Sequence, residues 1–274
     1  MADRRPILIA TDLSARTDRA LDRACSLASL WDVPLLVCHV LEAEGPSAET
    51  HDLVAAEVAA TLPEVAPNTE IIVQEGSAPA VILRLASERD CQLIVTGVAR
   101  FNQLGDFFIG TAVDRIIREA TSAVLVVRQR PRAEYRSILA TTDFSTCSRD
   151  ALVRAATMFP DAAIHVVHAF HVPFEGLLSV EENLEEFRSE AEGEFETFMN
   201  DAAIPPSITK RCTTHLVYGE TATVVQQVAK EAGTDLLVFG THGRSGFSKA
   251  VFGSVAEALL RCAQIDTLVV REPA

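Results

Sequence analysis

Short apolar segments alternate with segments of helical periodicity along the whole chain. The apolar segments are rich in Val, Ile and Leu and do not alternate cleanly with polar residues, which is typical of strands buried on both faces of a parallel sheet. After a first strand at residues 7–10, strands are expected near residues 34–40, 70–74, 92–97, 123–128, 163–169, 214–218, 235–240 and 267–271. This β-α-β-α order predicts an α/β fold of open parallel sheets with helices on both faces.

Two expected helices have clear beginnings and clear apolar faces. Ser14 and Ser145 each follow a strand and are good N-cap residues. The buried faces predicted for the helices that follow comprise Ala20, Leu21, Ala24, Leu27 and Ala28, and Ala151, Leu152, Ala155 and Ala156. Open parallel sheets of this kind bind ligands at the carboxyl ends of the strands, where the strand order reverses.

The second half of the chain repeats the first. Segment 9–14 (IATDLS) returns as 140–145 (ATTDFS), and segment 93–97 (LIVTG) returns as 236–240 (LLVFG). The matches keep their order, and their offset grows from about 130 to 143 residues between His168 and Gly219. We therefore predict two homologous domains, residues 1–130 and 134–274, with an acidic helical insertion at about 171–212 in the second domain.

Composition and charge restrict the partners and the location. The 24 basic and 38 acidic residues give a net charge of −14, which repels a phosphate backbone, so nucleic acid is not an expected partner. The longest stretch without a charged residue, 162–174, is too short for a membrane helix, so no membrane partner is expected. The apolar segment 7–10 is too short for a signal peptide. We expect a soluble, cytoplasmic protein.

The six cysteines do not form a metal or redox motif. They are never closer than thirteen positions, which excludes CxxC spacing. Free cysteine behaves as a small hydrophobic residue. We expect all six to be reduced and most to be buried.

A glycine-rich segment follows the fourth strand of the second domain. Gly240, Gly243 and Gly246 precede Gly253-Ser254, which opens a helix. Glycines let backbone N–H groups approach an anion, and a helix N-terminus adds free donors and a partial positive charge. Arg244 and Lys249 lie in the same segment. The pattern favours phosphate, although a plain exposed turn would have the same composition.

Other catalytic and binding motifs do not fit the spacing. The glycines do not form GxGxxG or GxxxxGK[ST], and Ser245 does not lie in GxSxG. His165, His168 and His171 could suggest a metal site, but His165 and His168 point to opposite faces of a strand. We interpret these three as ordinary strand and loop histidines.

The pattern Gly240-x2-Gly243-x9-Gly253-Ser254, with Asp143 after the first strand and His168 in the second, resembles the ATP-binding class of the universal stress protein family. The resemblance covers both halves, so the chain resembles a tandem universal stress protein. It implies a Rossmann-like, adenine nucleotide alpha hydrolase-like fold, with two five-stranded sheets. It also implies ATP as the cofactor, with Mg²⁺ held through the nucleotide near Asp143. The nucleotide site expected in the second domain comprises Thr142, Asp143, Ala169, Gly240, His242, Gly243, Arg244, Gly253, Ser254 and Val255.

The first domain departs from the pattern, because Arg100 replaces the second glycine. A side chain there blocks the approach of the backbone to phosphate, yet arginine itself binds phosphate well. A weaker candidate site therefore comprises Asp12, Val40, Gly97, Arg100, Gly110 and Thr111.

These features favour a stress-response protein that binds ATP mainly in its second domain and has a regulatory or protective role. Two alternatives stay open. One is a slow ATPase or nucleotidyl-transfer enzyme using Asp143 with Ser254 or His242, and the other is an interaction scaffold without a nucleotide. Family resemblance further implies an internal pseudo-dimer formed through the strands at 125–127 and 268–270, with any further homodimer using other surfaces.

Overall fold

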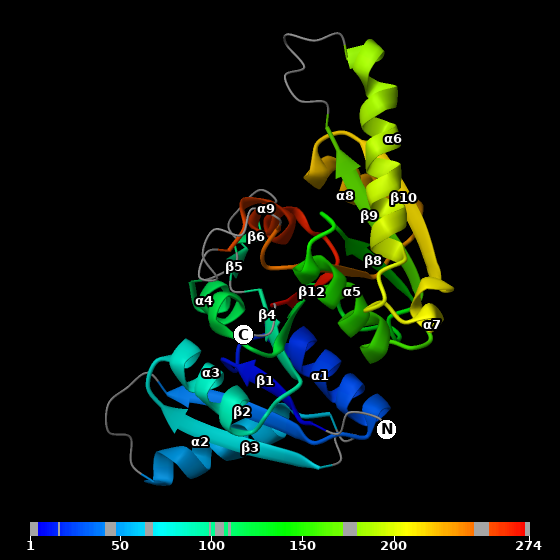
Figure 1. Ribbon diagram of the computed structural model, residues 1–274. Coiled ribbons are helices and arrows are strands. Elements are labelled where there is room, and N and C mark those ends of the chain that lie inside the picture. Colours follow the sequence, from blue (N-terminus) through cyan, green and yellow to red (C-terminus); the bar gives the residue numbers. More distant parts are fainter. Residues whose placement is uncertain are drawn as a thin grey trace. The chain divides into compact units, whose positions relative to one another are not determined.

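The computed structural model describes residues 5–15, 17–41, 48–63, 68–98, 100–101, 107–108, 111–171, 180–243 and 252–271. Its contacts divide the chain into two compact units, Met1–Glu134 with Pro273–Ala274, and Tyr135–Glu272. The elements of each unit can be followed in Figure 1. Within the described residues, no helix combines the length and the apolar composition needed to cross a membrane.

The first unit alternates strands and helices. Its elements are β1 (Ile7–Thr11), α1 (Asp18–Trp31), β2 (Leu35–Leu41), α2 (Ala48–Thr61), β3 (Thr69–Glu75), α3 (Ala78–Glu88), β4 (Leu93–Gly97), β5 (Arg100–Phe101), β6 (Phe107–Phe108), α4 (Thr111–Glu119) and β7 (Ala123–Val127). Five of the strands form a parallel sheet in the order β7-β4-β1-β2-β3.

The second unit has the same plan. Its elements are β8 (Ser137–Thr141), α5 (Thr146–Met158), β9 (Ala163–Phe170), α6 (Val180–Met199), α7 (Pro206–Thr209), β10 (Cys212–Tyr218), α8 (Thr221–Glu231), β11 (Leu236–Gly240), α9 (Ser254–Cys262) and β12 (Asp266–Val270). The strands form a parallel sheet in the order β12-β11-β8-β9-β10. The prediction of two open parallel five-stranded sheets with helices on both faces is confirmed.

The order of the strands reverses at one point in each sheet. The chain moves from β8 outward to β9 and β10, and then returns to place β11 on the other side of β8. The reversal therefore lies between β8 and β11, and between β1 and β4 in the first unit. The helices that follow two such strands leave toward opposite faces, which opens a crevice at their carboxyl ends.

The central strands and the inner faces of α1 and α5 form the cores. Ile7, Leu8 and Ile9 of β1 are fully buried, as the unbroken apolar run predicted. All the residues predicted to form the buried faces of α1 and α5 are buried. The six cysteines are free, four of them buried and Cys212 and Cys262 half-buried. Burial raises the pKa of Cys25 and Cys38 to about 11, which disfavours the reactive thiolate.

The two predicted helix caps had different outcomes. Ser145 is the N-cap of α5, and its side chain accepts a hydrogen bond from the Ser148 amide at 3.2 Å. The prediction for Ser14 was wrong, because α1 begins only at Asp18, after Thr17. The physical reason is that the Thr17 amide donates to the Ser14 carbonyl at 2.9 Å in a turn that precedes the helix, whose first backbone hydrogen bond then runs from the Leu21 amide to the Thr17 carbonyl at 2.8 Å.

The acidic insertion lies between β9 and β10. Among the described residues, the equivalent connection of the first unit holds the 14-residue α2, whereas that of the second unit holds the 20-residue α6 and the short α7. Phe195 and Phe198 of α6 are buried and lie 5.4 and 5.7 Å from the ring of Phe144. Most of the described glutamates of α6 are exposed. The helix is therefore amphipathic.

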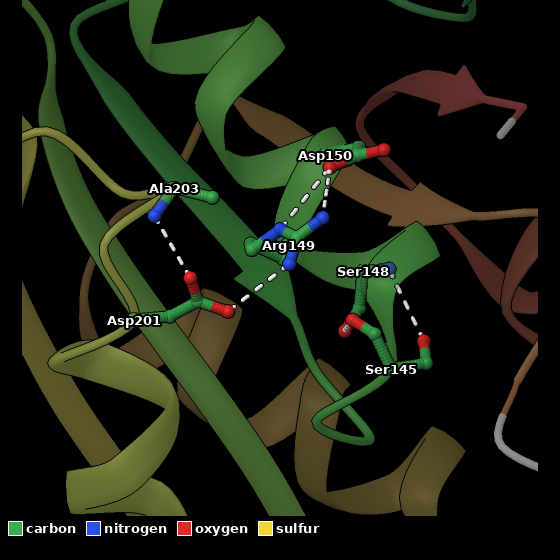
Figure 2. Close-up of polar contacts among 6 residues, drawn as sticks. All are labelled: Ser145, Ser148, Arg149, Asp150, Asp201 and Ala203. Atoms are coloured by element: carbon green, nitrogen blue, oxygen red, sulfur yellow. Dashed lines mark hydrogen bonds and ion pairs between the residues drawn. The ribbon is translucent and has the colours of Figure 1, made fainter. Parts of the chain in front are cut away.

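A charged contact joins α5 to the segment after α6 (Figure 2). Arg149 donates to Asp201 Oδ2 at 3.0 Å and to Asp150 Oδ1 at 3.1 Å, and its side chain is only 21% exposed. Asp201 also accepts the Ala203 amide at 2.8 Å. The Ala203 amide first, and Arg149 second, lower the pKa of Asp201 below its usual value. This carboxylate closes the turn that follows α6.

Gly240 is required by the packing of α5 on β11. A Cβ atom at this position would lie 2.6 Å from Cys147 Sγ and 3.0 Å from the Cys147 backbone. The backbone contact cannot be relieved by a change of rotamer. The absence of a side chain at residue 240 therefore lets the helix approach the strand.

We predict that Gly240→Ala lowers the free energy of unfolding by about 1–3 kcal/mol, the usual cost of overpacking. Gly193→Ala is the matched control, because a Cβ at this exposed position of α6 meets nothing within 4 Å. It should raise stability by about 0.5–1 kcal/mol, since glycine disfavours helix interiors. Urea unfolding followed by circular dichroism measures both. Equal stability of Gly240→Ala and wild type would show that α5 moves away at no cost.

A second prediction concerns the pH dependence contributed by Asp201. Because its pKa is lowered in the folded state, the ionised carboxylate stabilises the fold above its unfolded pKa of about 4, and this contribution is lost as pH falls through the lowered folded value. Asp201→Asn should therefore be less stable than wild type at pH 7 and equal to it near pH 2. Arg149→Met should reduce this pH dependence without abolishing it, because the Ala203 amide remains. Parallel stability curves for wild type and Asp201→Asn would contradict the assignment.

Candidate functional site

A cavity of about 390 Å³ opens at the carboxyl edge of the second unit's sheet. Its walls come from the ends of β8, β9 and β11 and from the first turns of α8 and α9. The lining residues are Thr141, Thr142, Asp143, Ser148, Val167, His168, Ala169, Thr221, Val225, Phe239, Gly240, Thr241, His242, Gly243, Gly253, Ser254, Val255, Ala256 and Leu259. The cavity thus lies at the reversal of strand order, and its volume is within the range of small-molecule sites.

A tight turn after β8 positions Asp143. The Thr142 hydroxyl accepts the Phe144 amide at 2.9 Å, and Asp143 Oδ1 accepts the Ser145 amide at 3.1 Å and the Ser145 hydroxyl at 2.5 Å. Phe144 has a φ of 64°, in the left-handed region that bulky residues rarely adopt. The two side-chain acceptors hold this conformation and fix one oxygen of the carboxylate.

His168 joins the end of β9 to the end of β8. Its Nδ1 lies 2.7 Å from the Thr142 carbonyl oxygen. Because a carbonyl oxygen can only accept, Nδ1 must carry the hydrogen. The ring also stacks on Phe144, with centroids 4.2 Å apart. The histidine therefore has a structural role in the wall of the cavity, consistent with its interpretation as an ordinary strand residue.

Gly243 lies directly against the carboxylate of Asp143 in the wall of the cavity. A Cβ at position 243 would lie 2.5 Å from Asp143 Oδ2. The φ of Gly243 is outside the left-handed range, so the residue is not needed for an unusual backbone conformation. It is needed because any side chain would meet the carboxylate.

The N-terminus of α9 forms another part of the wall. The Gly253 amide donates to the Thr241 carbonyl at 3.0 Å, and α9 begins at Ser254 as predicted. Within the part of the chain that the structure describes, no side chain caps this helix. Its first-turn N–H groups and its dipole therefore favour an anion.

The structure brings together nearly all residues expected in the second site. Thr142, Asp143, Ala169, Gly240, His242, Gly243, Gly253, Ser254 and Val255 line the cavity. Arg244 lies outside the described residues. His242 Nδ1 is 2.7 Å from the Thr241 hydroxyl, so part of this ring is engaged within the wall.

Several lining residues were not anticipated from the sequence. Thr221 and Val225 lie one turn apart at the start of α8, and Ser148 lies in the first turn of α5. Their position in the sequence could have indicated them. Each lies in the first turns of a helix that directly follows a strand, and these helices begin at the carboxyl edge of the sheet, where the cavity lies. The Ser148 hydroxyl lies 2.9 Å from that of Thr142, so it also supports the Asp143 turn.

The first unit repeats the turn but not the glycine loop. Asp12 Oδ1 accepts the Ser14 amide at 3.0 Å and hydroxyl at 2.6 Å, and Leu13 has a φ of 57°. His39 Nδ1 lies 3.0 Å from the Thr11 carbonyl. Burial opposes ionisation of Asp12, but the hydrogen bonds from Ser14 and Thr17 outweigh it and lower the pKa of Asp12. The aspartate end of a site is therefore present in both units.

The other residues of the weaker candidate site are placed only in part. Val40 is half-buried in β2, and Gly97 is buried at the end of β4. Arg100 begins the two-residue strand β5, which pairs with β6 in an antiparallel hairpin. Thr111 is the first residue of α4, and Gly110 lies outside the described residues. An extended hairpin thus occupies the chain position at which the second unit has Gly243.

Comparison with known proteins is consistent with this arrangement. A solved universal stress protein from Archaeoglobus fulgidus has a TM-score of 0.69 at 16% identity, over 98% of this chain and 99% of that one. A functionally unknown protein from Pseudomonas aeruginosa has the same TM-score at 19% identity, over 98% and 93%. These similarities show the fold.

The sequence comparisons identify the family. Universal stress protein A homolog 1 of Coxiella burnetii is 32% identical over 144 residues, which cover 50% of this chain and 96% of that protein. A universal stress protein of Methanocaldococcus jannaschii is 28% identical over 148 residues, 51% of this chain and 84% of that protein. The model of the universal stress protein family matches residues 3–128 and again 134–271. The chain therefore belongs to the universal stress protein family and carries two copies of its domain in tandem.

Proposed function

We propose that the second unit binds an adenine nucleotide, ATP, in the cavity at the reversal of strand order, and that the chain acts as a nucleotide-dependent regulatory or protective protein rather than as a strong catalyst. The observation that carries this proposal is the presence of two chemically different walls in one cavity. One wall presents the carboxylate of Asp143, and the other presents the N-terminus of α9.

The charges of the two walls define how a nucleotide would lie. A carboxylate accepts hydrogen bonds and repels phosphate, whereas a helix N-terminus donates hydrogen bonds and attracts phosphate. The nucleoside end of the ligand is therefore expected near Asp143. The phosphates are expected at Gly253 and Ser254, with Mg²⁺ held mainly by the phosphates themselves.

The apolar part of the lining suits a purine ring. Val167, Val225, Phe239 and Leu259 are buried side chains that reach the cavity from two strands and two helices. Small-molecule sites are typically lined by such residues, with a few polar groups fixing the orientation of the ligand. The cavity combines both features.

The two units are proposed to be unequal. Both have the aspartate turn, with closely similar hydrogen bonds. They differ where the second unit has Gly243 beside Asp143 and the first has the β5-β6 hairpin. We therefore expect one high-affinity ATP site per chain, in the second unit.

Titration of the intact chain with ATP by calorimetry tests the proposal. The expected stoichiometry is near one. Asp143→Ala should weaken binding about 10- to 150-fold, the equivalent of losing one hydrogen bond to a charged group at about 1.5–3 kcal/mol. Asp12→Ala is the matched control, because it removes the same turn from the first unit and should leave the affinity unchanged. A stoichiometry near two, or equal losses in both variants, would overturn the assignment to the second unit.

A further prediction concerns Gly243. Gly243→Arg, which copies residue 100 of the first unit, should weaken ATP binding at least tenfold, because its Cβ alone would lie 2.5 Å from Asp143 Oδ2. Stability should change little, since residue 243 is exposed. Arg100→Gly serves as the reciprocal control and should leave the affinity of the single site unchanged. Calorimetry and thermal unfolding separate the two effects, and an unaltered affinity for Gly243→Arg would show that the ligand does not need this gap.

A further inference from the structure

Two histidines face each other on neighbouring strands of the second unit. His165 Nδ1 in β9 lies 3.0 Å from His215 Nε2 in β10, with ring centroids 5.2 Å apart and an angle of 37° between the rings. The strands are parallel, and His165 is in register with Thr213. His215 is two residues further along β10, so both rings lie on the same face of the sheet.

This pair is separate from the nucleotide cavity. Neither His165 nor His215 lines it, whereas His168, three residues further along β9, does. Both rings of the pair are half-buried and thus partly open to solvent. β10 is the last strand of the unit's sheet. The pair therefore lies at the margin of the sheet, where a small solute can reach it.

The surroundings of His215 favour a neutral ring. Burial first, and the neighbouring His165 second, lower the pKa of His215, while the charge of Glu231 in α8 opposes this shift. A neutral imidazole has a lone pair for a metal ion. Glu231 also supplies negative charge nearby, which favours the approach of a cation.

We propose that His165 and His215 form a binding site for a divalent transition-metal ion, with Cu²⁺ preferred. The two ring nitrogens are 3.0 Å apart. Two nitrogens at about 2.05 Å from one metal ion are about 2.9–3.4 Å apart over the range from square-planar to tetrahedral angles, so small rotations of the rings suffice for both to bind one ion. Cu²⁺ is preferred because imidazole is a good ligand for it and because it stands highest in the general order of affinity of divalent ions.

Binding requires only local adjustments. In the hydrogen bond, the N–H of one ring points directly at the nitrogen of the other. To bind a metal ion, each ring must turn so that both nitrogen lone pairs point at the same ion, which lies to one side of the line between the two nitrogens. The χ2 torsion of histidine is broad, and both rings are partly exposed, which permits this rotation. The shared hydrogen moves to the other nitrogen of the donor ring, so two neutral rings bind the ion without net release of a proton.

Water completes the coordination. Within the described residues, no group of three His, Cys, Asp or Glu side chains could hold a metal ion. The site is thus a two-ligand site that connects β9 to β10. Bound metal would stabilise this margin of the second unit.

The test is titration of the untagged, full-length chain with CuCl₂, followed by electron paramagnetic resonance. Wild type should bind one Cu²⁺ at this site with hyperfine coupling to two nitrogens, and thermal unfolding should move to higher temperature. His165→Gln and His215→Gln should each lose the two-nitrogen signal and the thermal shift. His171→Gln is the matched control, because it removes an exposed histidine just beyond the end of β9 and should retain both.

Thermal unfolding and circular dichroism of the metal-free variants establish that each variant is folded. The proposal is overturned if folded His165→Gln or His215→Gln binds Cu²⁺ with the wild-type signal, or if wild type shows no two-nitrogen species. Tighter binding of Zn²⁺ than of Cu²⁺ would overturn the preference for Cu²⁺. These outcomes are independent of nucleotide binding, since the pair does not line the cavity.

Discussion

The structure of each unit depends on one residue that enters the left-handed region directly after the first strand. Phe144 and Leu13 have φ values of 64° and 57°, a conformation that costs about 1–3 kcal/mol for such residues. The hydroxyl of the threonine two positions earlier offsets this cost by accepting a hydrogen bond from the amide of the left-handed residue. The turn directs the aspartate to the carboxyl edge of the sheet. In the second unit it also places the Phe144 ring against His168 and Phe195, so the acidic helix α6 packs on the same turn.

The glycines of the loop have distinct physical reasons. Gly240 allows α5 to approach β11, Gly243 leaves room for the Asp143 carboxylate, and a Cβ at Gly253 would lie 3.4 Å from the Thr241 carbonyl oxygen. None of the three has a positive φ. A glycine pattern that is typical of nucleotide sites is thus needed in part for the packing of the residues that line the cavity, even when no ligand is bound. Gly243 is the one whose replacement acts most directly on the cavity.

Sequence reasoning predicted the elements better than the contacts between them. The unbroken apolar runs placed β2 and β4 within one residue of their observed bounds, because strands buried on both faces leave a strong local pattern. Ser14 was misplaced as a cap because the Thr17 amide bonds to the Ser14 carbonyl and the helix begins only after that turn. The local sequence does not reveal this, since the hydroxyls of Ser14 and Ser145 bond to the preceding aspartates in the same way. Thr221 and the pair His165 and His215 depend on strand order and register, which bring together residues far apart in the chain. Periodicity carries no information on such pairings.

The comparison of the two units separates the constraints of the fold from those of the site. The aspartate turn and the bond from histidine to the threonine carbonyl occur in both units. They hold the ends of the first two strands together, so they are needed whether or not a ligand binds. After the fourth strand the units differ at residue 243, a glycine, which corresponds to Arg100 at the start of the β5-β6 hairpin. The turns of Asp12 and Asp143 therefore belong to the constraints of the fold, whereas residue 243 beside the Asp143 carboxylate belongs to the constraints of the proposed site.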